Sequence, residues 1–280
     1  MSTPEHLSNS PLGKQTVQPT AYDPSVLFTV PRLSLREELG IRGSMPFFGL
    51  DILNAYELSW LNLRGKPQIG IISITVSADS PNIVESKSLK LYLNSFNQSK
   101  LAGEEALLEL LRADLSAAFG SPVQVNLLGP DAFSKIRYAE LEGRLLDRLD
   151  IEADEYNTSN TSFLETNIHE APVEEWLVSH LLKTNCPATG QPDFASIQIH
   201  YVGYQINEEG LLKYLISLRE HQAFHEQCTE LVFMDILRTC KPNSLAVYAR
   251  FTRRGGIDIN PWRSNFSSGK RPLYIRNARQ

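Results

Sequence analysis

Apolar residues recur with strand and helix spacing in the first half of the chain. The β-branched and apolar run at residues 68–78 (QIGIISITVSA) predicts a buried strand, and residues 121–128 predict another. Residues 83–91 read as a shorter strand. Residues 103–119 predict a helix between these strands, because one stripe of it is apolar. That stripe consists of Leu107, Leu108, Leu111, Leu115 and Phe119.

The second half of the chain repeats this mixture of elements. Residues 196–204 and 244–253 alternate between apolar and polar positions and predict strands. Residues 208–220 and 228–238 have helical spacing. Two halves that each mix strands with helices predict an α+β fold with an internal pseudo-repeat.

Composition along the chain predicts a division into four parts. Residues 1–30 are polar and proline-containing, and we expect them to form a flexible N-terminal lead-in. A first module at 31–150 and a second at 173–280 are joined by an acidic connector at 151–172. Acidic residues, Asn, Ser and Thr crowd this connector, which favours a solvated segment over a functional acidic site.

Overall composition narrows the classes of function. Of the 280 residues 42% are hydrophobic and 21% charged, and the net charge of −5 gives no support for a nucleic-acid partner. The three cysteines include no C-x-x-C pair, so neither a disulfide framework nor a structural zinc site is indicated. No secretory signal is visible, and the longest apolar stretch, 69–76, is far shorter than the roughly 20 residues of a membrane span. We therefore expect a cytoplasmic protein without a membrane partner.

One loop carries a candidate nucleophile. Residues 184–193 (TNCPATGQPD) contain two prolines and a glycine, so Cys186 and Asp193 lie on an irregular loop. A thiolate is a nucleophile, and a nearby carboxyl can accept its proton and later donate one. The alternative, in which Cys186 is a small buried residue and Asp193 caps a turn, stays open.

A second segment combines carboxylate and lysines. In residues 85–92 (ESKSLKLY), strand alternation would put Glu85 and Lys87 on one face. A carboxylate can accept two parallel N–H bonds from a guanine-like edge, and Lys87 and Lys90 suit cofactor phosphates. A solvated edge strand of alternating charge is the competing interpretation.

Two further short segments suit ligand binding. His225 and Glu226 are adjacent, so both can reach one ligand only at a helix end or a turn. Residues 253–256 (RRGG) suit phosphate binding, since glycine lets the backbone come close and arginine can bind in a bidentate way. A capping pair and a tight surface turn are the competing interpretations. No G-x-G-x-x-G motif follows a strand, so a dinucleotide would bind outside a Rossmann fold.

Together these segments resemble a known family, the 7-cyano-7-deazaguanine reductases, which are nitrile reductases of the queuosine pathway. Residues 85–92 look like the family signature, and residues 184–196 (TNCPATGQPDFAS) resemble its cysteine loop. The His-Glu pair and the Arg-Gly turn follow in the family's order, and the resemblance to the long, two-module form covers about 43–262. Ala188 and Phe194 stand where valine and tryptophan are more usual, and both changes keep an apolar side chain.

The resemblance implies a fold, a reaction and a set of site residues. The fold would be a tandem of tunnelling-fold modules, with antiparallel sheets and helices packed on one face. Cys186 would attack the nitrile to form a thioimide, and Asp193 would deliver the proton in an NADPH-dependent reduction to the primary amine. The resemblance assigns substrate binding to Val84, Glu85, Ser86, His225 and Glu226, and cofactor binding to Ser86, Lys87, Arg254 and Gly255. It also implies a deazapurine substrate, no metal and a homodimer.

Two other functions remain open at this point. A metal-dependent enzyme of the pterin or cyclohydrolase type can share this fold, although Cys186 has no partner cysteine and no clear histidine spacing. A non-catalytic purine-binding module would need the carboxylates but not the thiol.

Overall fold

The chain divides into two compact units in the computed structural model, which describes residue 10, residues 18–267 and residues 275–280. The first unit comprises the described residues up to Leu35, Leu50–Ile136 and Arg253–Ile259. The second unit comprises Arg36–Gly49, Arg137–Thr252 and the described residues of Asn260–Gln280. Because the units interleave along the chain, no single cut near residue 150 separates them. The predicted boundaries of the two modules, 31–150 and 173–280, stay a prediction.

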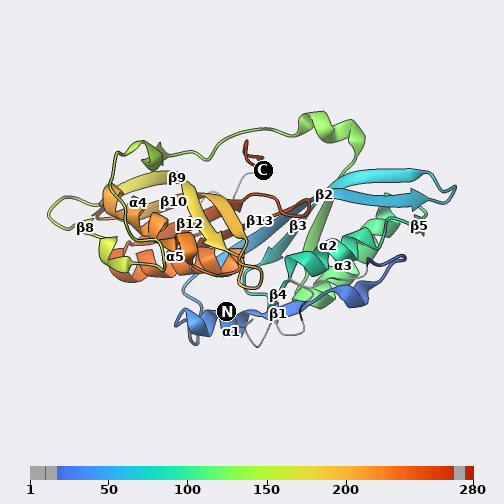
Figure 1. Ribbon diagram of the computed structural model, residues 1–280, viewed down its shortest axis with the longest axis horizontal. Coiled ribbons are helices and arrows are strands. Elements are labelled where there is room, and N and C mark those ends of the chain that lie inside the picture. Colours follow the sequence, from blue (N-terminus) through green and yellow to red (C-terminus); the bar gives the residue numbers. More distant parts are fainter. Residues whose placement is uncertain (1–9, 11–17, 268–274) are drawn as a thin grey trace. The chain divides into compact units, whose positions relative to one another are not determined.

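The first unit contains an antiparallel sheet in the order β6-β3-β2, with the short β5 parallel to β2 (Figure 1). β1 and β4 form a separate antiparallel pair, and α1 and β2 continue from one unit into the other along the chain. The elements are a 3₁₀ helix, η2 (Pro24–Val26), β1 (Thr29–Pro31), α1 (Arg32–Glu38), β2 (Phe48–Asn62), β3 (Pro67–Ser77), β4 (Asn82–Val84), α2 (Ser86–Asn94), β5 (Lys100–Leu101), α3 (Glu104–Phe119), β6 (Val123–Leu128) and a second 3₁₀ helix, η3 (Pro130–Lys135).

The predicted helix and strands of the first half are confirmed, with one exception. α3 buries Leu107, Leu111, Leu115 and Phe119 in the core of the first unit. It ends at Gly120, whose φ of 68° is the left-handed conformation that glycine adopts without strain.

The strand predicted at 83–91 is wrong beyond Val84, because α2 begins at Ser86. Glu85 caps this helix with its side chain, and the buried residues Leu89 and Tyr92 lie three positions apart, one helical turn. The predicted common strand face of Glu85 and Lys87 therefore does not exist.

The second unit contains a larger sheet in the order β13-β12-β10-β9-β7. Neighbouring strands are antiparallel except β7, which runs parallel to β9. The elements are β7 (Arg144–Leu145), η4 (Leu146–Arg148), η5 (Thr161–Phe163), β8 (Thr166–Asn167), β9 (Val173–Asn185), β10 (Pro192–Gly203), β11 (Gln205–Ile206), α4 (Glu208–Ser217), η6 (Leu218–Glu220), α5 (His225–Cys240), β12 (Ser244–Phe251) and β13 (Ile257–Ser264).

Helices α4 and α5 cover one face of this sheet (Figure 1). Alternate residues of β10, such as Ile197 and Ile199, and of β12, such as Val247, point into the core beneath them. The predicted strands at 196–204 and 244–253 and the helices at 208–220 and 228–238 are confirmed, and α5 begins earlier than expected, at His225. The α+β prediction, with antiparallel sheets and helices, is confirmed.

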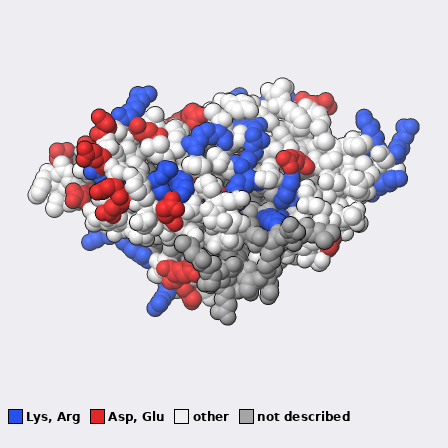
Figure 2. All heavy atoms as spheres, in the orientation of Figure 1, with Lys and Arg blue, Asp and Glu red and all other residues white. Residues whose placement is uncertain are grey.

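The lead-in lies mostly outside the described residues, at 1–9 and 11–17. Within its described part, Tyr22 packs on the core of the first unit and Thr29–Pro31 forms β1. The flexible lead-in stays a prediction. In the part of the chain that the structure describes, no helix is both long and apolar enough to cross a membrane. Lysine and arginine are interspersed with aspartate and glutamate on the face drawn in Figure 2.

Candidate active site

The β9–β10 hairpin places Cys186 and Asp193 on the same face of the second unit's sheet. Asp193 lies in β10 and not on the predicted loop, and it is paired with Thr184 in the strand register. Cys186 follows Thr184 by two positions, directly after the end of β9, where continued alternation returns its side chain to the face of Asp193. The loop between the strands is closed at Cys186, whose N–H donates to Gln191 O at 2.8 Å. Cys186 and Asp193 are both buried, with 5% and 3% of their surfaces exposed. A thiol and a carboxyl thus share one largely dry surface.

The first turn of α5 adds an imidazole to this surface. His225 Nε2 lies 3.4 Å from Asp193 Oδ1. The ring of His225 stacks on Phe251 of β12, with centroids 3.9 Å apart and planes 5° apart. Its buried Nδ1 has no hydrogen-bond partner among the described residues. The structure therefore brings His225 of one predicted segment to Asp193 of another, the segment that also carries Cys186.

Glu226 follows His225 as the second residue of α5, and its side chain is buried. The pair lies at a helix start, which is the one helical position where adjacent side chains can serve one ligand. The positive end of the helix dipole also favours negative charge here, whether on Glu226 or on Asp193.

A second thiol, Cys228, lies close to Asp193 and was not predicted. Burial raises the pKa of Cys228 to about 12, and the negative charge of Asp193 adds to this shift. Cys228 is therefore a neutral thiol at physiological pH. Cys228 follows His225 by three residues, which places both on one side of a helix. This spacing was the sequence signal that could have pointed to Cys228.

In the first unit, Glu85 is bound to the start of α2. Its Oε1 accepts from the Lys87 N–H at 2.6 Å and its Oε2 accepts from the Ser88 N–H at 2.9 Å, while Ser86 Oγ donates to Oε1 at 3.3 Å. Burial raises the pKa of the Glu85 carboxyl above its ordinary value, although the hydrogen bonds from Lys87 and Ser88 oppose the shift. A ligand that binds Glu85 would have to donate to the lone pairs of the carboxylate that do not already accept these hydrogen bonds. The side chain of Val84 packs in the core, so only its backbone can face a ligand.

The Arg-Gly segment forms a tight turn in the same unit. Arg254 and Ile257 exchange two backbone hydrogen bonds, of 2.9 and 3.1 Å, across Gly255 and Gly256. Both glycines have positive φ, 59° and 76°. A Cβ added to Gly255 would lie 3.8 Å from Lys90 Cγ, so this turn lies beside α2, the helix that carries Lys87. Lysines, an arginine and an exposed glycine backbone are a donor set that suits the phosphates of a dinucleotide.

The predicted site residues thus fall into two groups, one in each unit. Cys186, Asp193, His225 and Glu226 belong to the second unit, and Val84, Glu85, Ser86, Lys87, Arg254 and Gly255 belong to the first. Among the described residues, no group of three or more His, Cys, Asp or Glu side chains is arranged to hold a metal ion. The expected absence of a metal stays a prediction.

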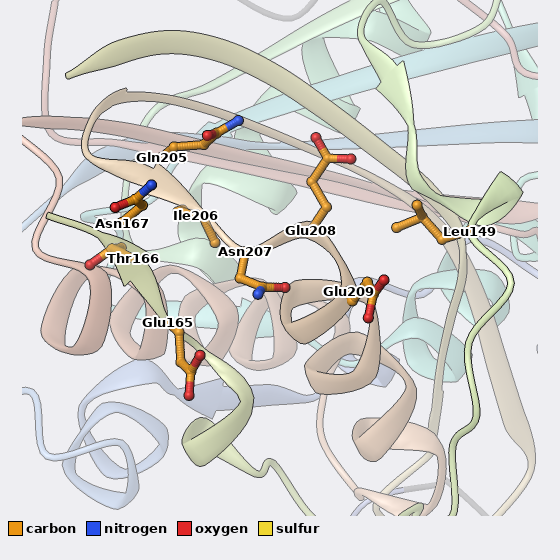
Figure 3. A pocket seen from close by; sticks show the side chains of 9 residues that line it. All are labelled: Leu149, Glu165, Thr166, Asn167, Gln205, Ile206, Asn207, Glu208 and Glu209. Atoms are coloured by element: carbon orange, nitrogen blue, oxygen red, sulfur yellow. The ribbon is translucent and has the colours of Figure 1, made fainter. Parts of the chain in front are cut away.

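A cavity of about 490 Å³ also lies in the second unit, and other segments of the chain line it (Figure 3). Its lining includes three carboxylates, and Arg144 pairs with the one at Glu208. The lining residues are Leu149, Glu165, Thr166, Asn167, Gln205, Ile206, Asn207, Glu208 and Glu209. None of the predicted site residues lines this cavity.

A buried thiol with a carboxyl and an imidazole on one sheet face defines a candidate thiol enzyme. Two family models match the chain. Residues 18–127 match the N-terminal region of "Nitrile reductase, 7-cyano-7-deazaguanine-reductase", and residues 192–270 match "QueF-like protein". The chain belongs to this nitrile reductase family.

Curated relatives agree over the full length of the chain. It is 58% identical over 282 aligned positions to the "NADPH-dependent 7-cyano-7-deazaguanine reductase" of Ralstonia nicotianae and to that of Cupriavidus necator, covering 100% of both chains in each case. The protein of the same name from Burkholderia vietnamiensis is 57% identical over 277 positions, 99% of each chain. A solved structure, the archaeosine synthase QueF-Like in the apo form, covers 35% of this chain and 97% of its own, with 15% identity and a TM-score of 0.30. That overlap is too weak to support any inference.

Proposed function

We propose that this chain catalyses the NADPH-dependent reduction of 7-cyano-7-deazaguanine to 7-aminomethyl-7-deazaguanine, a step in tRNA queuosine biosynthesis. Full-length similarity to curated reductases of that nitrile supports the reaction. The observation that carries the chemistry is the common face of Cys186, Asp193 and His225 in the second unit.

In this proposal Cys186 is the covalent nucleophile. A nitrile is a poor hydride acceptor, and addition of the Cys186 sulfur to its carbon gives an imine-like thioimide that accepts hydride readily. The thiol proton leaves as the S–C bond forms, and one proton is added to the nitrogen, so the adduct is the sum of thiol and nitrile. Burial of Cys186 shields this adduct from hydrolysis by water.

Asp193 handles the protons of the covalent step. Its carboxyl takes the proton from the thiol and delivers one to the nitrile nitrogen, which prevents negative charge from accumulating there. His225, 3.4 Å from Asp193, and the buried Glu226 bind the edge of the deazaguanine ring. Val84, Glu85 and Ser86 complete the substrate contacts.

Ser86, Lys87, Arg254 and Gly255 hold the cofactor. The open backbone of the Gly255 turn and the neighbouring lysines fit its phosphates. When bound, the cofactor supplies a hydride in each of two steps, and the complete reaction consumes two cofactor molecules and two protons per amine. After the first reduction the C–S bond breaks, which returns Cys186 as a thiol before the second.

We further propose that the enzyme is cytoplasmic, works as a homodimer and does not bind nucleic acid. The net charge of −5 supports the last point. Light scattering after size-exclusion chromatography tests the dimer.

Intact-protein mass spectrometry tests the central claim. Incubation with the nitrile alone should add the mass of one substrate to the wild-type chain and to Cys240→Ala, but not to Cys186→Ala. Cys186→Ala should still bind the substrate, since it retains the ring contacts. An adduct on Cys186→Ala would remove the proposed nucleophile, and full turnover by that variant would show that the reduction does not pass through a Cys186 thioimide.

A further inference from the structure

An ion pair lies directly against the Arg-Gly turn of the first unit. Lys90 of α2 pairs with Glu57 of β2, with Lys90 Nζ in contact with Glu57 Oε2. The register between β2 and β3 shifts between Ala55 and Leu58, so Glu57 belongs to a β-bulge. Bulges commonly redirect a side chain next to a functional site.

The bulge and the turn fit each other closely. The N–H of Tyr56 donates to Gly256 O at 2.9 Å, and the Arg253 guanidinium lies 4.9 Å from the centre of the Tyr56 ring. Gly256 has a φ of 76°, which favours glycine, and a Cβ built on it would lie 2.5 Å from Glu57 Cδ, so the carboxylate lies close over the turn. The Glu57 carboxylate is thereby held over the turn.

Lys90 binds this carboxylate, and further cations lie on the two elements beside it, α2 and the Arg-Gly turn. Lys87 and Lys90 lie three positions apart on one side of α2, and Arg253 and Arg254 begin the turn that Glu57 overlies. The Glu57 side chain is 60% exposed and that of Lys90 only 22%. An ion pair with so exposed a carboxylate contributes little to stability, and water can replace Glu57 at low cost when another anion binds Lys90.

We infer that Glu57 is an internal substitute for a cofactor phosphate: Lys90 binds Glu57 when the site is empty and transfers to a phosphate of the cofactor when it binds. The inference rests on the proposed function, which places the cofactor at this turn. Glu57 then weakens cofactor binding. This is useful because each catalytic cycle needs two cofactor molecules, so the oxidised one has to leave while the substrate is still half reduced.

Calorimetric titration of the full chain with NADPH, in the absence of nitrile, tests the inference without turnover. Glu57→Gln keeps the shape of the side chain and removes its charge, and the dissociation constant should fall roughly two- to five-fold, the gain from not breaking an exposed ion pair. Glu105→Gln is the matched control, because Glu105 forms an exposed pair with Arg112 in the same unit. Its dissociation constant for NADPH should equal that of the wild type.

A double-mutant cycle shows whether Glu57 acts through Lys90. Lys90→Gln should weaken NADPH binding, and Glu57→Gln should have no effect when added to Lys90→Gln. Titration with NADH identifies the phosphate: an effect of Glu57→Gln confined to NADPH indicates the 2′-phosphate, and equal effects on both cofactors indicate the diphosphate.

An unchanged dissociation constant in Glu57→Gln, or an equal gain in the Lys90→Gln background, would overturn the inference. Either result leaves the proposed function standing if the wild type binds NADPH and Cys186 forms the nitrile adduct. Failure of the wild type to bind NADPH at all would instead sink the proposed function.

Discussion

His225 lies flat on Phe251, with ring centroids 3.9 Å apart and ring planes 5° apart. The same imidazole approaches Asp193, with Nε2 3.4 Å from Oδ1. Phe251 is paired with Ala195 in the register of β10 and β12, and Ala195 follows Asp193 by two positions on the same face. The pairing of two strands thus fixes the plane in which the imidazole lies beside the carboxyl. In the mechanism that we propose, Phe251 is therefore a positioning residue for His225 and Asp193.

Phe251→Leu should slow formation of the Cys186 adduct by roughly 10- to 100-fold, because a misplaced His225 no longer orients Asp193 and the ring of the substrate. Leucine keeps the buried site apolar, so the loss of stability should stay near 1 kcal/mol. Mass spectrometry of samples quenched at increasing times after mixing with the nitrile measures the rate, and urea unfolding measures the stability.

Phe119→Leu is the matched control. Phe119 is also almost fully buried, but it lies in the core of the first unit and touches none of the proposed catalytic groups. It should lose similar stability and form the adduct at the wild-type rate. Equal rates in both variants would show that Phe251 only fills space.

The elements that were predictable from the sequence are those in which one pattern, either a continuous apolar run or a helical stripe, is unbroken. Residues 68–78 and the apolar stripe of α3 are such cases. β2 was missed because a bulge between Ala55 and Leu58 breaks its alternation. α2 was misread because glutamate is an uncommon helix cap, so Glu85 hid the start of the helix.

The candidate site was predictable where its residues are close in sequence. A short segment was enough to suggest that Cys186 and Asp193 lie near each other. Adjacency restricted a shared ligand of His225 and Glu226 to a helix end or a turn, and α5 begins at His225. Phe251 was not predictable, because its contact with His225 depends on the strand register. Glu57 was not predictable for a similar reason, since a bulge and a distant glycine turn bring it to Lys90.

Glu226→Gln should weaken binding of the nitrile substrate by roughly 10-fold, measured calorimetrically in the Cys186→Ala background so that no adduct forms. The amide presents a donor where the carboxylate accepts an N–H of the base, and the buried position prevents water from repairing the mismatch. Glu209→Gln changes the same position of α4, an exposed second residue in the first turn of a helix, and should leave affinity unchanged. Equal affinities in all three proteins would place Glu226 outside the substrate site.

Glu230→Ala should destabilise the second unit by about 3–5 kcal/mol, because it leaves two buried cations without their carboxylate. Glu230 accepts from Arg36 through both of its oxygens, at 2.8 and 3.0 Å, and Arg263 binds its Oε1 at 2.9 and 3.0 Å. All three side chains are buried. The midpoint of urea unfolding measures the loss.

The exposed pair of Arg112 and Glu105 provides the comparison for this triad. Glu105→Ala should cost at most about 1 kcal/mol, the usual limit for an ion pair in water. A loss of similar size in Glu230→Ala would mean that water or another anion reaches the two arginines.

Alkaline pH should destabilise the fold through its buried thiols. Burial raises the pKa of Cys228 and of Cys240 to about 12, above the value of 9.0 for an exposed thiol. Between these values the unfolded chain loses protons that the folded chain keeps, so the free energy of unfolding falls with rising pH, by up to about 1.4 kcal/mol per pH unit for each thiol.

Cys228→Ala and Cys240→Ala should each make this fall shallower, as measured by urea unfolding in a series of buffers from neutral pH to beyond pH 9.0. Ser217→Ala removes a buried hydroxyl that does not titrate in this range and should shift the whole curve without changing its slope. A slope that is the same in both cysteine variants and in the wild type would mean that the thiols ionise freely in the folded protein.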